Sequence, residues 1–148
     1  MRLERLYRAT FTTPEAWHVE LSGEYGVEEQ GFLVIDGRTD GRVTGRLRAS
    51  NFPRRRADGT QTPDIRGVIE TDDGSVVLFS WHGYGRAGST GARQLVGSLT
   101  HVSDDERYTW LNDAVCAVEG EVRPQDGGGF SVVLDVFELV WEALTSVN

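Results

Sequence analysis

Apolar and polar residues alternate along most of the chain, in runs of about six to eleven residues that turn-forming residues interrupt. A period of two is typical of β-strands with one buried face, and punctuation every eight to twelve residues is typical of an antiparallel meander. No segment combines a sustained helical period with capping residues. The pattern predicts strands over residues 3–12, 16–24, 31–36, 42–49, 64–72, 75–82, 94–102, 108–111, 114–122 and 130–141.

Dipeptides of Asp, Gly, Thr and Pro separate the predicted strands. The strongest signal is Asp73-Gly74, which lies between two β-rich runs and predicts a two-residue hairpin with a type I′ turn. In this register Glu70 lies opposite Val77, and a slip of one residue would exchange the two faces of the hairpin. Further turns are predicted at Thr13-Pro14, Asp36-Gly37, Asp40-Gly41, Asp58-Gly59 and residues 126–129.

The hairpin register predicts which residues share a face. One face carries Asp64, Arg66, Val68 and Glu70 beside Val77, Phe79 and Trp81. The other carries Ile65, Gly67, Ile69 and Thr71 beside Val76, Leu78, Ser80 and His82. The second face has no full charge and is the better candidate for the interior, but the aromatic residues of the first face also favour burial, so both alternatives stay open.

A sheet of about ten strands must protect its edge strands from pairing with other chains. Closure into a barrel removes the edges, and a barrel of about eight or more strands can hold one small ligand. With 148 residues and no linker or repeat, the chain has the size of one domain. We therefore predict an all-β fold, a single-domain closed antiparallel β-barrel of about 8–10 strands with a central pocket over residues 1–148. A β-sandwich is the alternative.

Composition agrees with this fold and excludes several functions. The chain has 18 Gly, 17 Val and 12 Thr, which favour strands and tight turns. All 15 cationic side chains are Arg, so Schiff-base enzymes and P-loop NTPases are excluded because both need a lysine. The single cysteine, Cys116, lies in an apolar run that predicts an unreactive thiol. The three histidines lack the spacing of known metal sites, so we expect neither a metal nor a cofactor.

Charge and hydropathy constrain location and partners. No apolar stretch is long enough to span a membrane and the first residues do not form a signal peptide, so we expect a cytoplasmic protein without membrane contact. A net charge of −8 argues against nucleic acid as a partner. Seven arginines in residues 38–56 are interpreted as outward strand positions paired with acids on neighbouring strands, rather than as an anion patch. Both faces of residues 130–141 are apolar, which predicts a homodimer.

Three stretches follow one another in a characteristic order: Asp64-Ile65-Arg66, residues 70–75 and Tyr108-Thr109-Trp110-Leu111-Asn112. Together with Gly41, Gly45 and the apolar strand 133–138, they resemble an uncharacterised bacterial family catalogued as domain of unknown function three-two-three-seven. The resemblance covers about residues 3–140, although Asn51-Phe52-Pro53 stands where the family often has Ala-Asp-Trp. It implies a single-domain antiparallel β-barrel with a central pocket and no established reaction.

Asp64 and Arg66 are the candidate catalytic pair. A guanidinium can hold a carboxylate or enolate oxygen, and a carboxylate can orient it or act as a base. Aromatic, amide and imidazole side chains would supply the wall of the pocket. The candidate substrate-binding residues are Glu70, Trp81, His82, His101, Tyr108, Trp110 and Asn112. The alternative is that Asp64 and Arg66 form an exterior ion pair and Trp110 belongs to the core.

Two functions fit this constellation, both with a small-molecule partner. One is a cofactor-independent isomerase, cyclase or hydratase that acts on a small apolar carbonyl compound or an acidic metabolite. The other is a non-catalytic, lipocalin-like ligand-binding protein. A charged pair at the bottom of the pocket favours the enzyme, whereas an apolar lumen with polar groups only at its rim favours the binding protein. If Arg66 points outward, the pocket is expected around His82, His101 and Trp110.

Overall fold

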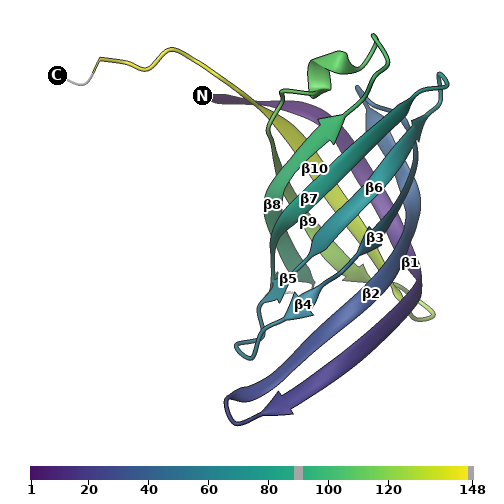
Figure 1. Ribbon diagram of the computed structural model, residues 1–148, viewed down its shortest axis with the longest axis vertical. Coiled ribbons are helices and arrows are strands. Elements are labelled where there is room, and N and C mark those ends of the chain that lie inside the picture. The colour runs from purple at the N-terminus through teal and green to yellow at the C-terminus, as the bar shows by residue number, and fades with distance from the viewer. Residues whose placement is uncertain (89–91, 147–148) are drawn as a thin grey trace.

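The computed structural model describes residues 1–88 and 92–146, and its strands form a closed antiparallel β-barrel (Figure 1). Eight strands pair in the ring β1-β2-β3-β6-β7-β8-β9-β10 and back to β1, which confirms the predicted fold. The ring strands are β1 (Arg2–Gly23), β2 (Gly26–Gly41), β3 (Gly45–Asn51), β6 (Asp64–Thr71), β7 (Val76–Ala87), β8 (Arg93–Val102), β9 (Cys116–Pro124) and β10 (Phe130–Val140). Two short strands, β4 (Arg54–Arg55) and β5 (Gln61–Thr62), bridge β2 to β7.

Alternate residues of the ring strands point into the barrel, as their sequence period requires, except at a register shift in β1 where Leu6 and Tyr7 are both buried. Trp81, Tyr7 and Ile35 are among the largest side chains that are almost fully buried. Small residues on the barrel wall make room for these large side chains. A Cβ atom added at Gly97 would lie 2.8 Å from Nε1 of Trp81, so glycine at this position lets the indole pack against the barrel wall.

Two predicted turns lie inside long strands. Thr13-Pro14 is a bulge in β1, where the register with β2 shifts between Thr12 and Glu15, and the strand continues beyond it. Asp36-Gly37 lies within β2 opposite Phe11 and Thr12. A Cβ atom at Gly37 would approach the Cβ atom of Phe11 to 2.5 Å, so this glycine serves a close strand contact instead of a turn.

The predicted type I′ turn at Asp73-Gly74 is wrong. The backbone N–H of Thr71 donates to the carbonyl of Ser75, so the loop has three residues, and Gly74 adopts a positive φ of 88°. The hydroxyl of Thr71 accepts a hydrogen bond from the N–H of Ser75 at 2.8 Å and donates to Asp73, which stabilises the wider loop. Glu70 therefore lies opposite Val76.

This slip of one residue decides which hairpin face is inside. The β6 residues of the uncharged face do point inward, but the β7 residues predicted beside them do not. The interior face combines Ile65, Gly67, Ile69 and Thr71 with Val77, Phe79 and Trp81. Asp64, Arg66 and Glu70 lie outside with Ser80 and His82.

The two ends of the barrel differ. A segment over residues 103–115 closes one end, and it contains the 3₁₀-helix η1 (Thr109–Leu111) where a strand over 108–111 was predicted. Leu111 of this segment is fully buried. At the other end the β1–β2 hairpin projects beyond the ring (Figure 1), and this end is open. Within residues 1–88 and 92–146 no helix is long and apolar enough to cross a membrane.

Candidate functional site

A pocket of about 310 Å³ opens at the end of the barrel that carries the β1–β2 hairpin. Side chains from six ring strands form its apolar wall, and each of them follows the inward alternation of its strand. They are Phe11, Ile35, Ile65, Trp81, Leu95 and Val132. A concave apolar cavity of this size is typical of small-molecule sites.

Polar side chains surround the mouth of this pocket: His18, Glu29, Arg55, Gln61 and Arg93. Glu29 lies between two partners, with His18 Nδ1 at 3.2 Å from one carboxylate oxygen and Arg55 Nη2 at 3.6 Å from the other. Arg93 donates from Nη1 to Oε1 of Gln61 at 2.7 Å. We call these five residues the mouth cluster.

Arg93 carries the least compensated charge of the mouth cluster. Its side chain is part-buried, and no carboxylate of the described residues lies within ion-pair distance of it. Burial lowers the pKa of Arg93, and the neighbouring Arg55 lowers it further, whereas Glu29 acts in the opposite direction. An anion bound beside Arg93 would therefore relieve the unfavourable interaction between the guanidinium groups of Arg93 and Arg55.

The indole of Trp81 forms part of the pocket wall. The residue is 1% exposed, and its Nε1–H has no hydrogen-bond partner among the described residues. Buried donors without a partner are rare because each costs free energy. Nε1 packs against Gly97 and has almost no accessible surface, so the indole presents its apolar ring atoms to the pocket.

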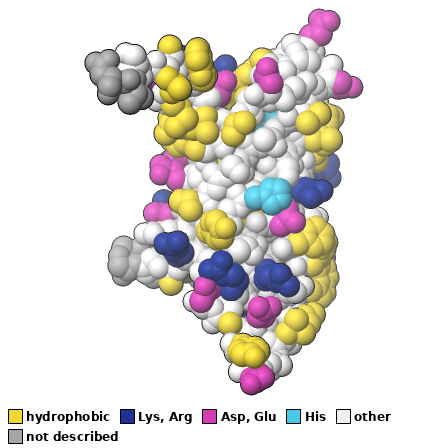
Figure 2. All heavy atoms as spheres, turned by 60° about the vertical axis from the view of Figure 1, so that its left-hand side comes forward, with side chains coloured by type: hydrophobic (Ala, Val, Ile, Leu, Met, Phe, Trp, Pro, Cys, Tyr) yellow, Lys and Arg dark blue, Asp and Glu magenta, His cyan; other side chains and the backbone are white. Residues whose placement is uncertain are grey.

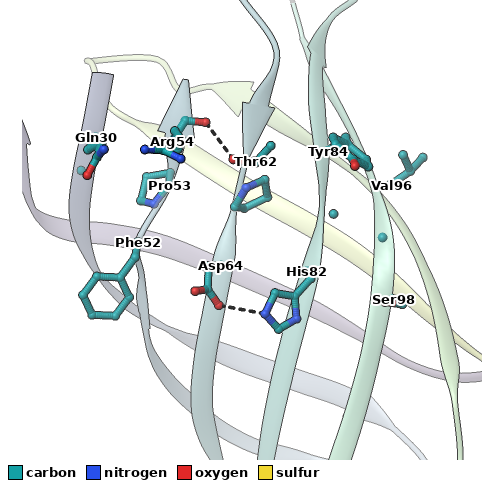
Figure 3. Close-up of a pocket in the computed structure, with 14 residues that line it drawn as sticks. Gln30, Phe52, Pro53, Arg54, Thr62, Asp64, His82, Tyr84, Val96 and Ser98 are labelled. Carbon is teal, nitrogen blue, oxygen red and sulfur yellow. Dashed lines mark hydrogen bonds and ion pairs between the residues drawn. The ribbon is translucent and has the colours of Figure 1, made fainter. Parts of the chain in front are cut away.

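A second concavity, a groove of about 750 Å³, lies on the outer wall of the barrel across β6, β7 and β8 (Figure 3). Asp64 and His82 point toward one another in it, with Oδ1 of Asp64 and Nε2 of His82 separated by 3.1 Å. Among the residues that the structure describes, that carboxylate oxygen accepts no hydrogen bond of good geometry. The two side chains are 41% and 57% exposed, so water screens this ion pair and an anion or cation here would keep much of its hydration.

The structure corrects the prediction for the catalytic pair. Arg66 does not reach the lumen: its side chain is 72% exposed on the outer wall and lies 3.9 Å from Asp64, which is the exterior ion pair of the alternative interpretation. Glu70 is also outside, where it pairs with Arg48. The pocket expected around His82, His101 and Trp110 for an outward Arg66 is not found among the described residues either, since His82 lies on the outer wall. The cause is the three-residue loop, which places Phe79 and Trp81 on the face opposite Arg66.

Four other predicted site residues belong to the closed end, away from the pocket. His101 is buried and its Nε2 lies 2.8 Å from the hydroxyl of Tyr7. Trp110 stacks beneath the guanidinium of Arg42 at 4.3 Å and donates from Nε1 to a main-chain carbonyl. Tyr108 donates to the Asp73 carboxylate at 2.7 Å, and Asn112 bonds to the main chain of Ser103 at 2.8 and 2.9 Å. These contacts hold the end segment in place, and Trp81 is the predicted residue that lines the lumen pocket.

The mouth cluster was missed by the sequence analysis, although one signal was available. The predicted strand 94–102 places Leu95 and Leu99 on one face, and extending it by one residue puts Arg93 on that same face. The other members come from β1, β2, β4 and β5, which periodicity does not bring together.

The arginines of residues 38–56 lie mainly outside, as interpreted, whereas Arg55 joins the mouth cluster. Three of the outward arginines pair with acids of neighbouring elements: Arg38 with Asp72, Arg46 with Asp36 and Arg48 with Glu70. Among residues 1–88 and 92–146, no three His, Cys, Asp or Glu side chains cluster in a way that could hold a metal ion.

Comparisons with known proteins identify the fold. No protein-family model matches the sequence, and no curated protein is significantly similar to it. A β-barrel-like protein of Acinetobacter baumannii AYE superposes with a TM-score of 0.77 at 19% identity, over 93% of this chain and 94% of that one. A protein of unknown function from Clostridium acetobutylicum gives 0.76 at 17% identity, over 95% and 100%. An enzyme from Penicillium herquei gives 0.62 at 19% identity, over 91% and 93%. The chain shares its β-barrel fold with these proteins.

Proposed function

We propose that this protein binds a small molecule with an apolar body and an anionic group at the open end of its barrel. The observation that carries the proposal is Arg93, a part-buried guanidinium without a carboxylate partner among the described residues, at the mouth of an apolar cavity. Most polar groups of the pocket lie at the rim, which is the arrangement expected of a binding protein.

The lining supports one orientation of the ligand. Its apolar body would contact Ile65, Leu95 and Val132, where each Å² of apolar surface removed from water contributes about 25 cal/mol. Its anionic group would lie between Arg93 and Arg55, since a charge-assisted hydrogen bond forms there without breaking an existing ion pair of Arg93.

Calorimetry with two matched probes tests this proposal. Octanoate and 1-octanol share an apolar chain, and only octanoate is charged, so we expect octanoate to bind more tightly to the full chain. Arg93→Met keeps the bulk and removes the charge, which should weaken octanoate binding about tenfold to a hundredfold and leave 1-octanol unaffected. Arg86→Met is the control, because Arg86 lies on the outer face of neighbouring β7. Equal losses in both variants, or no octanoate binding at all, would contradict the proposal.

A cofactor-independent enzyme is the second candidate, and a specific pair favours it. His18 Nδ1 lies 3.2 Å from the Glu29 carboxylate at the pocket mouth, and a carboxylate that orients an imidazole is an arrangement suited to general-base chemistry. The base could remove a proton next to a ligand carbonyl, with Arg93 beside the developing enolate. The Penicillium herquei protein of the same fold is described as an enzyme, which supports this candidate by analogy alone.

Proton exchange separates the two candidates. A keto acid with an aromatic body, 4-oxo-4-phenylbutanoate, is incubated with the protein in deuterated water, and loss of the signal of the protons next to its ketone is followed by nuclear magnetic resonance. If the His18→Gln variant no longer catalyses the exchange but still binds the keto acid, the result supports the enzyme. Binding without accelerated exchange supports the binding protein.

A further inference from the structure

The projecting part of β1 has an unpaired edge. β1 pairs with β10 as far as Thr12, which lies opposite Ser131, and from Glu15 to Gly23 it pairs with β2 alone among the described residues. Figure 1 shows this hairpin extending below the ring, away from the other strands. Its outer edge therefore presents main-chain N–H and C=O groups to solvent, which is a template for pairing with another strand.

The same edge carries apolar side chains on its outward face. Trp17, Val19 and Leu21 alternate along it and are 55%, 62% and 51% exposed. The stripe continues across the hairpin through Phe32, whose ring centroid lies 5.7 Å from that of Trp17 and 5.2 Å from that of Phe52. In Figure 2, hydrophobic side chains reach the surface at this lower end of the molecule. No proline interrupts the edge between Glu15 and Gly23, although proline commonly protects exposed strands.

We propose that this edge pairs with the same edge of a second copy of the chain, antiparallel about a two-fold axis at Val19. Directly opposite residues in this register have numbers that add to the same value, so Val19 faces its own copy and Trp17 faces the partner's Leu21. The outward stripes then form one continuous apolar surface across the dimer, as an isologous interface requires.

Side-chain complementarity favours this register. On the inward face the axis at Val19 places His18 opposite the partner's Glu20, and Glu20 has no ion pair among the described residues. An axis at Glu20 would place two carboxylates face to face, which is unfavourable. An axis at His18 would place two imidazoles face to face and leave Glu20 opposite Ala16. The register at Val19 is the only one of these three that pairs the imidazole with a carboxylate.

This dimer would also involve the pocket. His18 belongs to the mouth cluster and already contacts Glu29 through Nδ1, so the partner's Glu20 would approach the mouth from the opposite side. The proposed face differs from the one expected from the sequence. Of the residues in 130–141 that motivated that expectation, Val133, Phe137 and Leu139 are part-buried within the chain itself, whereas Trp141 is 80% exposed.

Molecular mass in solution tests the face. Sedimentation equilibrium of the full chain at micromolar concentration should give a dimer, and Val19→Asp should give a monomer because two carboxylates would meet at the axis. Val102→Asp is the matched control, since Val102 is 60% exposed on β8, and it should remain dimeric. Circular dichroism confirms that each variant is folded. A monomeric wild type, or a dimeric Val19→Asp, overturns the proposal.

Disulfide formation tests the register. Opposite Cα atoms in an antiparallel pair are about 4.5–5.5 Å apart, within the range of a disulfide, so Val19→Cys should cross-link to its own copy under mild oxidation. Leu21→Cys should not, because its copies would be separated by about 13 Å. The double variant Trp17→Cys/Leu21→Cys should cross-link again. Native Cys116 is fully buried and does not compete. Cross-linking of Leu21→Cys as efficient as that of Val19→Cys overturns the register.

Discussion

The hydroxyl of Tyr7 and Nε2 of His101 lie 2.8 Å apart near the closed end of the barrel, joining β1 to β8 across its interior. Both residues are 1% exposed. Burial lowers the pKa of His101 to about 4 and raises that of Tyr7 well above its usual value. Both groups are therefore neutral at physiological pH, and the pair is a buried, uncharged contact of the core.

The pKa of His101 predicts a loss of stability in mild acid. The unfolded chain takes up a proton at this histidine as the pH falls through about 6.5, whereas the folded protein takes it up only near 4, so stability falls across this window. Between about pH 7 and pH 5 the free energy of unfolding should fall by about 2 kcal/mol from this residue. Urea unfolding at several pH values measures it. His101→Gln should lack this part of the pH dependence, and an identical dependence in both proteins would contradict the assignment.

Asn112 should matter for stability and not for ligand binding. Its side-chain amide satisfies the N–H and the C=O of Ser103, a residue that is 5% exposed. Asn112→Ala leaves both main-chain groups unpaired, so we expect a loss of about 2 kcal/mol, about 1 kcal/mol for each hydrogen bond. Denaturant unfolding measures this loss. Asp113→Ala, an exposed neighbour, is the control and should change stability by no more than about 0.5 kcal/mol. A loss of octanoate affinity in Asn112→Ala with stability unchanged would reverse this assignment.

Arg66→Met should leave the pocket unaffected. The Arg66 side chain is 72% exposed on the outer wall, where its Nε lies 3.9 Å from Asp64, so removing the guanidinium changes neither the shape nor the charge of the lumen. Octanoate affinity measured by calorimetry should therefore equal that of the wild type. Arg93→Met, studied in parallel, provides the positive control. A tenfold loss in Arg66→Met would mean that the outer wall takes part in binding.

Cys116 should resist modification in the folded protein. The side chain is fully buried, and burial raises the pKa of its thiol to about 11, so very little thiolate is present or accessible near pH 8. Titration with a chromogenic disulfide reagent should detect no thiol in the native protein and one per chain after denaturation. Rapid labelling of the native protein would show that β9 opens readily.

The alternation of apolar and polar residues was sufficient to predict an all-β fold and most of the strands, because burial of one strand face is a local property. The need to protect edge strands then favoured a closed barrel over a sandwich. Leu95, Leu99 and His101 point inward as their spacing indicates. The resemblance to the uncharacterised bacterial family stays a prediction, since no family model matches the chain.

Contacts between distant residues decided what the pattern left open. The hairpin loop gained one residue because Thr71 and Tyr108 both donate hydrogen bonds to Asp73, and Tyr108 is 35 residues away in the sequence. The extra loop residue shifts the register of the hairpin by one and so places Arg66 on the outer face of the barrel. The dipeptide Thr13-Pro14 is typical of a turn, yet it forms a bulge because β1 pairs with β2 on both sides of the dipeptide.

The mouth cluster shows the same limit. Its members come from five strands, and Arg93 and Gln61 are 32 residues apart along the chain. Local sequence reports whether a side chain faces the interior, through the period of its strand. Which interior side chains meet depends on strand register and on barrel closure, and both follow from the total free energy of pairing and packing instead of from any one segment.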